Sequence, residues 1–389
     1  MRARLRLDPA LLAIGMLASC AQGERSTSNG APPAASLLAA PKAPSAPVEK
    51  PPFEPPRDDP PAPMPGPRRM RLAAAVTEND ACIACHDDEA REWQSSFHHR
   101  ANTDPAYVAA FRIEPTPFCR SCHAPEADPR KEPPPKVSEL GVGCVTCHVT
   151  EEGTVLAAEH AGTPPVNAPH PIRRSIELAH QGGCAGCHEF RFPRPGGDDD
   201  DAFFMQTTAR EHRRSPAAER ACADCHMPVE RGHRSHAFAS VRDPAWLKKN
   251  LDVKVERASG DTLRVTLRQT DPGHDFPTGD LFRRLQVGVA IHAEDGTLLH
   301  RETRALTRHF ELIPGQLGRT LTADDRVTSE PREVDFPLPP SHEIPPRATI
   351  ACWVTYQRVA TTGTGQNPES ATIESEIPLF KTTLPFAPR

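Results

Sequence analysis

Apolar and polar residues alternate with period two in four stretches near the C-terminal end of the chain. These stretches are residues 251–257, 262–267, 285–292 and 348–356. Turn-forming residues at 259–261 and 294–296 separate or follow them. Such alternation predicts strands with one buried face, and several short strands in series are typical of an antiparallel β-sandwich. We therefore expect residues 243–389 to form a β-sandwich domain, in which Cys352 is a packed and unreactive thiol.

The region between residues 76 and 241 has no such alternation, and large aliphatic and aromatic residues are sparse there. One helical pattern occurs at residues 89–101, where Trp93 and Phe97 lie four positions apart. We expect a mostly helical and loop domain with little regular structure. Together with the strands that follow, this predicts the α+β fold class.

The first residues of the chain resemble an export signal. Three arginines precede an apolar run over residues 9–17, which is too short to span a bilayer. Residues 1–20 are therefore expected to be a signal peptide. The run ends in Leu17-Ala-Ser-Cys20, which resembles a bacterial lipobox. That resemblance implies cleavage before Cys20 and a lipid anchor on its thiol, with an ordinary secretory signal as the alternative.

The residue after Cys20 is Ala21 and not an aspartate of the kind that retains lipoproteins in the inner membrane. We therefore expect a periplasmic or cell-surface lipoprotein with an outer-membrane anchor. Residues 21–71 are rich in proline and alanine, and fourteen of the forty residues from 31 to 70 are proline. Such a segment cannot bury enough apolar surface to fold, so we interpret it as a disordered tether.

The central region carries five copies of the pattern Cys-x-x-Cys-His, which is the attachment motif of c-type haem. The cysteine pairs are Cys82 and Cys85, Cys119 and Cys122, Cys144 and Cys147, Cys184 and Cys187, and Cys222 and Cys225. The histidines are His86, His123, His148, His188 and His226. Two thiols at this spacing can form thioethers with one porphyrin, and the adjacent imidazole is then held at the iron. We expect five covalently attached haem c groups.

Paired Cys-x-x-Cys motifs can also hold zinc, and an exported chain can form disulfides. Zinc would use the motifs in twos, and their number here is odd. Neither alternative explains a histidine after every second cysteine. Haem attachment explains ten of the twelve cysteines at once.

Each iron also needs a ligand on its other face. Beyond residue 71 the chain offers only Met205 and Met227 as thioethers, and Met227 directly follows a motif histidine. Nine histidines between residues 98 and 274 lie outside the motifs. The excess of histidines over methionines favours ligation of each iron by two histidines. Such haems have lower reduction potentials than haems ligated by one methionine and one histidine.

Further residues resemble multihaem cytochromes related to hydroxylamine oxidoreductase and its tetrahaem electron-acceptor cytochrome. The similar segments are Trp93 with residues 96–101, then residues 141–144, 168–171 and 225–228. The resemblance implies that His98, His170 and His236 are distal ligands. It suggests His160 for a fifth haem.

Residues 273–279 read Gly-His-Asp-Phe-Pro-Thr-Gly and lie between predicted strands. They resemble an element found after the haem region of several multihaem cytochromes. The resemblance implies that His274 reaches back to a haem iron. A histidine that only stabilises a turn is the alternative.

Two function classes remain open. The first is an electron carrier between protein redox partners. The second is a reductase or oxidoreductase of a small nitrogen or sulfur oxyanion with one open haem. An active-haem motif with lysine in place of histidine, Cys-x-x-Cys-Lys, is absent from the chain. Only two tyrosines, Tyr107 and Tyr356, are available as catalytic residues. We therefore favour the electron carrier over the enzyme.

The formal net charge is −5, and loss of three arginines and one aspartate with the signal peptide would shift it to about −7. Haem propionates would add further negative charge. Nucleic-acid binding is not expected of such a chain.

Overall fold

The computed structural model describes residues 71–159, 168–191, 204–238, 243–259, 261–312, 319–360 and 370–386. All of them belong to one compact unit, Pro56–Arg389. The predicted signal peptide, the tether up to residue 70, Cys20 and His160 lie outside the described residues. Among the helices of the described part, none is long and apolar enough to cross a membrane.

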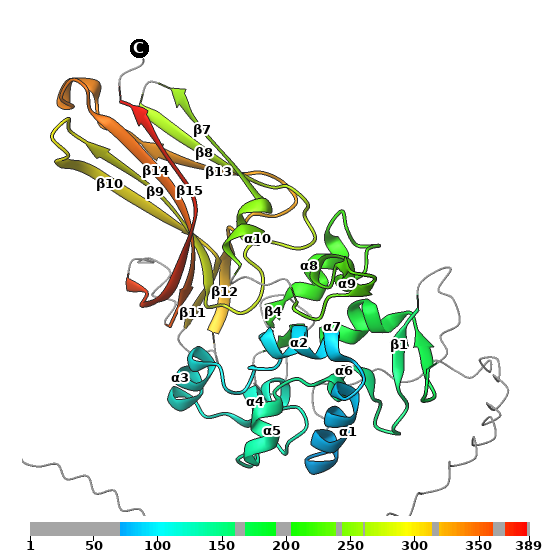
Figure 1. Ribbon diagram of the computed structural model, residues 1–389. Coiled ribbons are helices and arrows are strands. Elements are labelled where there is room, and N and C mark those ends of the chain that lie inside the picture. The colour runs from blue at the N-terminus through cyan, green and yellow to red at the C-terminus, as the bar shows by residue number, and fades with distance from the viewer. Residues whose placement is uncertain are drawn as a thin grey trace, which may run out of the picture. The chain divides into compact units, whose positions relative to one another are not determined.

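Short helices separated by loops make up the region of the Cys-x-x-Cys-His motifs (Figure 1). They are α1 (Ala73–Ile83), α2 (Asp87–Ser95), α3 (Pro105–Ile113), α4 (Pro117–His123), α5 (Pro135–Leu140), α6 (Cys144–His148), α7 (Gln181–His188), α8 (Thr208–Arg214) and α9 (Cys222–His226). Prolines at the first turn of α3, α4 and α5 favour helix initiation there. The side chains of Asp104 and Thr116 cap α3 and α4.

Four of the five motifs lie on a helix that ends at the motif histidine, namely α4, α6, α7 and α9. Two cysteines three positions apart on a helix lie on the same face, so both thiols can point toward one bound group. The first motif instead spans the end of α1, from Cys82 to His86.

Pairs of very short strands connect these helices. They are β1 (Leu156–Ala158) with β2 (Arg173–Ser175), β3 (Glu189–Arg191) with β4 (Phe204–Thr207), and β5 (Val229–Glu230) with β6 (His233–Arg234). The hydrophobic clusters of this region are small; one contains Trp93, Leu140 and Val145. The apolar clusters are small, as expected, whereas regular helices are more frequent here than the prediction of little regular structure implied.

The helix expected at residues 89–101 differs from the observed one. α2 begins at Asp87 and ends at Ser95 because Ser96 adopts an extended backbone, with φ −79° and ψ 166°. Phe97 and His98 consequently lie beyond the helix, in the turn that follows it.

Arg71, at the predicted end of the tether, contacts the folded part. Its guanidinium donates hydrogen bonds to the buried Glu126 carboxylate and to the carbonyl oxygen of Val145, at 3.0 and 2.7 Å. Glu126 also accepts a hydrogen bond from Thr146 at 2.9 Å. This network ties the start of the described chain to α6 and its motif.

Two antiparallel sheets follow the helix α10 (Pro244–Lys249). One has the order β13-β8-β7 and the other the order β10-β9-β14-β15 (Figure 1). The strands are β7 (Leu251–Ser259), β8 (Thr262–Gln269), β9 (Arg283–His292), β10 (Leu298–Leu306), β13 (Arg332–Pro337), β14 (Thr349–Val359) and β15 (Ile373–Pro385). A separate hairpin pairs β11 (Arg308–Leu312) with β12 (Arg319–Asp324).

Both sheets contribute to the largest hydrophobic cluster. Val265 and Phe336 come from one sheet and Val287 and Val354 from the other, and all four are fully buried. In the second sheet Val354 pairs with Val287, and Cys352 pairs with Val289. Cys352 is fully buried between Ile350 and Val354 in the alternation, as predicted. Helices and sheets together confirm the α+β class.

Candidate haem sites

Four of the five motif histidines face a second histidine from a distant part of the chain. The ring centroids of His86 and His170 lie 6.5 Å apart. The separation is 6.1 Å for His148 with His236, for His188 with His98, and for His226 with His274. The rings of His226 and His274 are nearly parallel, with an angle of 12° between their planes.

This separation fits one iron between two imidazoles. Two metal–nitrogen bonds of about 2 Å each, together with the distances from nitrogen to ring centre, give roughly 6 Å. Two histidine side chains in ordinary packing contact could lie closer. The residues present therefore fit a haem iron at each of these four positions, and the adjacent cysteine pairs supply the thioether partners.

The other ring nitrogen of several of these histidines is already engaged. Nδ1 of His148 lies 2.9 Å from the Leu156 carbonyl oxygen, Nδ1 of His236 lies 2.8 Å from that of Arg234, and Nδ1 of His274 lies 3.0 Å from that of Asp275. A carbonyl partner requires a proton on Nδ1 and leaves Nε2 as the free acceptor. Such partners orient metal-binding histidines in proteins.

Burial favours the neutral imidazole that a metal needs. Desolvation lowers the pKa of His98 to about 4, that of His188 to about 3 and that of His274 to about 4, with neighbouring histidines lowering it further. The pKa values of His148 and His236 are also lowered, chiefly by desolvation. These rings are uncharged at neutral pH.

The segment after α2 holds His98 through backbone contacts with residues 141–143. The Val142 amide donates to the His98 carbonyl oxygen at 2.8 Å, and the Trp93 indole donates to the Val142 carbonyl oxygen at 2.8 Å. Gly141 has φ +57°, and a Cβ there would lie 2.5 Å from the His98 carbonyl oxygen. Only glycine fits this close approach without moving the chain.

We therefore expect Gly141→Ala to displace His98 and to lower the free energy of unfolding by about 1–3 kcal/mol. Thermal unfolding and the low-spin haem signals of the loaded protein would measure both effects. Gly153→Ala is the matched control, because Gly153 also has a positive φ, +82°, but open space around it. Equal effects of the two substitutions on the haem signals would contradict this account of Gly141.

Glu92 on α2 positions the segment that carries His236. Its carboxylate accepts a hydrogen bond from the His236 amide at 2.8 Å and lies 3.0 Å from both His233 Nε2 and an Arg231 nitrogen. These hydrogen bonds lower the pKa of Glu92, although desolvation acts the other way and is the largest single contribution. His233 thus positions the loop and does not face a motif histidine among the described contacts.

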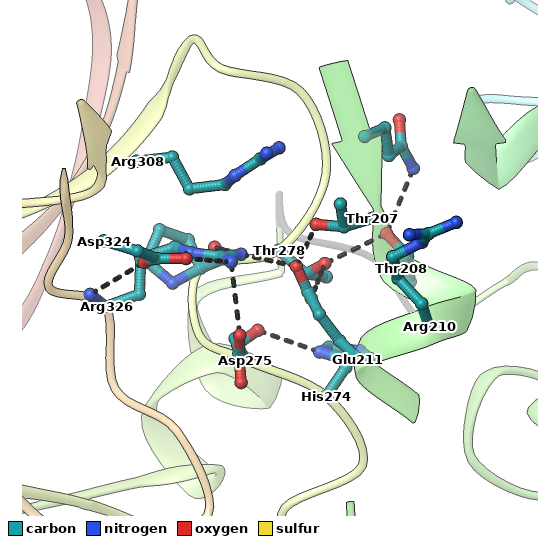
Figure 2. Close-up of polar contacts among 12 residues, drawn as sticks. Thr207, Thr208, Arg210, Glu211, His274, Asp275, Thr278, Arg308, Asp324 and Arg326 are labelled. Atoms are coloured by element: carbon teal, nitrogen blue, oxygen red, sulfur yellow. Dashed lines mark hydrogen bonds and ion pairs between the residues drawn. The ribbon is translucent and has the colours of Figure 1, made fainter. Parts of the chain in front are cut away.

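His274 is held by a polar cluster that joins the strand region to α8 (Figure 2). Glu211 of α8 accepts a hydrogen bond from Thr278 at 2.6 Å and forms an ion pair with Arg326 at 2.8 Å. Arg326 also pairs with Asp275 at 3.2 Å and with Asp324 at 2.7 Å. The loop of residues 273–279 therefore contacts α8 in the region of the motifs, and the ligand role of His274 stays a prediction.

This cluster is deeply buried. The Arg326 and Glu211 side chains are 4% and 1% exposed. Desolvation acts to raise the pKa of Glu211, but the Arg326 guanidinium outweighs it and the pKa is lowered. The pKa of Asp275 is raised to about 6 by desolvation and by the neighbouring Glu211 carboxylate. A cavity of about 300 Å³ beside the cluster is lined in part by Arg214, His274 and Arg308. Trp246 of α10 is a neighbour of the His226 and His274 pair, because its ring centroid lies 5.6 Å from that of His226.

The fifth motif histidine, His123, has no histidine counterpart among the described ring contacts. Its ring stacks instead on Tyr107, with centroids 3.9 Å apart and an angle of 9° between the planes. Its Nδ1 lies 2.5 Å from the Ala101 carbonyl oxygen. His160, which we expected to serve a fifth haem, lies outside the described residues. His99 packs on Trp93 at 4.4 Å and faces no motif histidine.

The cysteines of different motifs lie close enough to one another to shift their pKa values. Cys122 and Cys187 act on each other in this way, and so do Cys184 and Cys222. Cys82 acts electrostatically on Cys144, and Cys147 on Cys184 and Cys187. The five attachment motifs therefore form one connected group, with the fourth motif adjoining three others.

Sequence reasoning named the histidines of all four pairs but could not match them. It missed Glu92, Glu211 and Arg326, which position two of them. The only signal for these three was their charge, and charged residues are common on surfaces. The pairing itself has no local signal, because the partners come from different elements.

Comparisons with known proteins concern the class and the fold of the chain. Residues 81–149 match the family model described as cytochrome c554 and c-prime. A penta-heme cytochrome c552 from Thermochromatium tepidum has a similar structure, with a TM-score of 0.60 and 19% identity, covering 82% of this chain and 100% of that chain. A β-glucuronidase from Bacteroides uniformis covers 35% of this chain and 13% of its own at a TM-score of 0.18 and 11% identity, which carries no weight. A search of curated sequences gave no significant match.

The motifs, the family match and the similar fold together support a multihaem c-type cytochrome. Covalently bound haem c and electron transfer belong to that class.

Proposed function

We propose that this chain is an exported cytochrome with five haem c groups that carries electrons between protein redox partners. The observation that carries the proposal is the set of four histidine pairs with centroids 6.1–6.5 Å apart. In this proposal each pair ligates one low-spin iron. The pairs are His86 with His170, His148 with His236, His188 with His98, and His226 with His274.

The haems supply the redox chemistry, and the chain supplies ligands, spacing and burial. Two histidine ligands favour low potentials. The contacts between motif cysteines support close haem packing, in which the site of Cys184 and Cys187 adjoins those of Cys122, Cys147 and Cys222. Electrons could then pass between neighbouring haems without a mobile carrier.

The strands from residue 251 onward contribute to this function by providing His274. We interpret their two sheets as a β-sandwich, the strand domain, that supplies one axial ligand. This contribution explains why the polar cluster of Glu211 and Arg326 is buried between helix and strand elements.

We further propose that the chain is a lipoprotein anchored through Cys20 and held off the outer membrane by residues 21–71. The lipobox-like sequence and the proline content support this part of the proposal. Export also suits the haems, since c-type attachment takes place outside the bacterial cytoplasm.

Haem content and spin state test the central proposal. We expect the mass of the purified protein to correspond to five covalently bound haems, and low-temperature EPR to show at least four low-spin haems. Substituting both cysteines of one motif by alanine should remove one haem equivalent. Fewer than five haems in the wild-type protein, or a majority of high-spin irons, would contradict the proposal.

The alternative function, conversion of a small oxyanion at an open haem, is favoured by one observation only. His123 faces no second histidine among the described residues.

A further inference from the structure

We propose that Glu126 keeps the reduction potential of the haem at the third motif low, and that Arg71 partly offsets this effect. The third motif is the Cys-x-x-Cys-His segment of residues 144–148. Its haem belongs to the proposed function, on which this assignment rests. The new element is the electrostatic control of one particular haem by an ion pair that lies outside every attachment motif.

The Glu126 carboxylate is in direct contact with the third motif. Its Oε1 accepts a hydrogen bond from the Thr146 hydroxyl at 2.9 Å, and both side chains are buried. Thr146 lies between Cys144 and Cys147, which attach the haem, and His148 follows two positions later. One hydrogen bond therefore links the carboxylate to the segment that holds the haem.

Arg71 binds both this carboxylate and the helix α6 that carries the motif. Its guanidinium donates hydrogen bonds to the two carboxylate oxygens of Glu126, at 3.0 and 3.3 Å. It also donates to the carbonyl oxygens of Val145 and Val149 at the end of α6, at 2.7 and 3.2 Å. The Leu72 amide donates to the backbone carbonyl oxygen of Glu126 at 2.8 Å. These contacts fix both charges of the pair relative to the motif.

The two charges of the pair differ in burial. The Glu126 side chain is 0% exposed, whereas the Arg71 side chain is 15% exposed. Solvent therefore screens the positive charge more than the negative one. Arg71 also lies 3.6 Å from the half-exposed Glu78 carboxylate, which adds a second negative charge beside it. The sum of these charges at the motif is negative, although the pair itself is formally neutral.

A buried negative charge stabilises the oxidised form of a nearby haem. Reduction adds one electron and converts ferric to ferrous iron, so the positive charge that a carboxylate attracts becomes smaller. The attraction is stronger in the interior than in water, because the effective dielectric constant is lower there. Hydrogen bonding and burial around the haem are among the means by which a protein sets its reduction potential. Glu126 therefore lowers this potential, and Arg71 raises it by a smaller amount.

The test is a redox titration of the full-length, haem-loaded protein, followed by optical spectroscopy and EPR. In Glu126→Gln we expect one haem potential to rise, because the amide keeps the shape of the side chain and an acceptor for Thr146 but removes the charge. The component that shifts should be the one that is missing when Cys144 and Cys147 are both replaced by alanine. Arg71→Gln should shift the same component in the opposite direction.

Two controls separate charge from structure. Glu126→Asp keeps the charge, so the potential should rise less than in Glu126→Gln. Asp335→Asn neutralises a carboxylate that is also paired with an arginine, Arg264 at 2.8 Å, but is 46% exposed on the strand domain, and it should leave every haem potential unchanged.

Three results would overturn the inference and leave the electron carrier intact. The first is an unchanged set of potentials in Glu126→Gln. The second is an equal rise in Glu126→Gln and Glu126→Asp, and the third is a shift in the same direction in Glu126→Gln and Arg71→Gln, since both would indicate a structural role. Fewer than five haems in the wild-type protein would instead contradict the proposed function itself.

Discussion

Replacing His274 by alanine should convert one low-spin haem to high spin. His274 lies 6.1 Å from His226 with nearly parallel rings, and its Nδ1 is held by the Asp275 carbonyl oxygen. Without it, the iron at His226 loses its second imidazole, and its sixth position becomes accessible to added ligands. EPR of the loaded protein should show one more high-spin haem than the wild type, and carbon monoxide should bind one additional equivalent.

His309→Ala is a suitable control in the same strand domain. His309 pairs with Asp325 at 3.0 Å and faces no motif histidine. This substitution should leave the number of low-spin haems unchanged. If His274→Ala also left the number of low-spin haems unchanged, His274 would be a turn-stabilising residue, which is the alternative that the sequence allowed.

Replacing Arg326 by methionine should lower the free energy of unfolding by about 3–5 kcal/mol, the usual cost of removing one partner of a buried ion pair. Arg326 is paired with Glu211, Asp275 and Asp324, and its side chain is 4% exposed. Its loss leaves three carboxylates together without their counter-ion. Chemical denaturation followed by circular dichroism would measure the change.

The same substitution should loosen the loop that carries His274. We therefore expect a fraction of the protein molecules to have a high-spin haem at His226 in Arg326→Met, whereas all molecules should have one in His274→Ala. Arg268→Met is the control, because the pair of Arg268 with Asp252 is more than half exposed on both sides. Arg268→Met should lower the free energy of unfolding by less than about 1 kcal/mol. A similar loss of stability in both variants would show that the buried cluster has no special importance.

Much of the secondary structure was predictable where the signal is local. The strands β7, β8, β9 and β14 were expected from their alternation, because each has one face in the shared core. β15 was missed because most of its residues are exposed and those that pack against the core, such as Ile377 and Leu384, are only partly buried. β10 was missed for the same reason over most of its residues.

The candidate sites also have one part with a local sequence signal and one part without it. The cysteine pairs and their histidines are adjacent in the chain, so the haem-attachment motif can be recognised without any structure. The histidines that face them are not adjacent. His98 approaches His188 because Ser96 ends α2 and Gly141 allows close backbone contact. No local pattern encodes that approach.

The sequence by itself indicated the cofactor class and the α+β division and predicted the attachment residues, because attachment motifs and alternating strands consist of residues that are close together in the chain. Only the tertiary structure decided which histidines lie close in pairs, and that His123 stacks on Tyr107 among the residues it describes. The physical reason is that an axial pair is set by the folding of separate elements onto one another. Contacts such as those of Glu211 with Arg326 hold those elements in place.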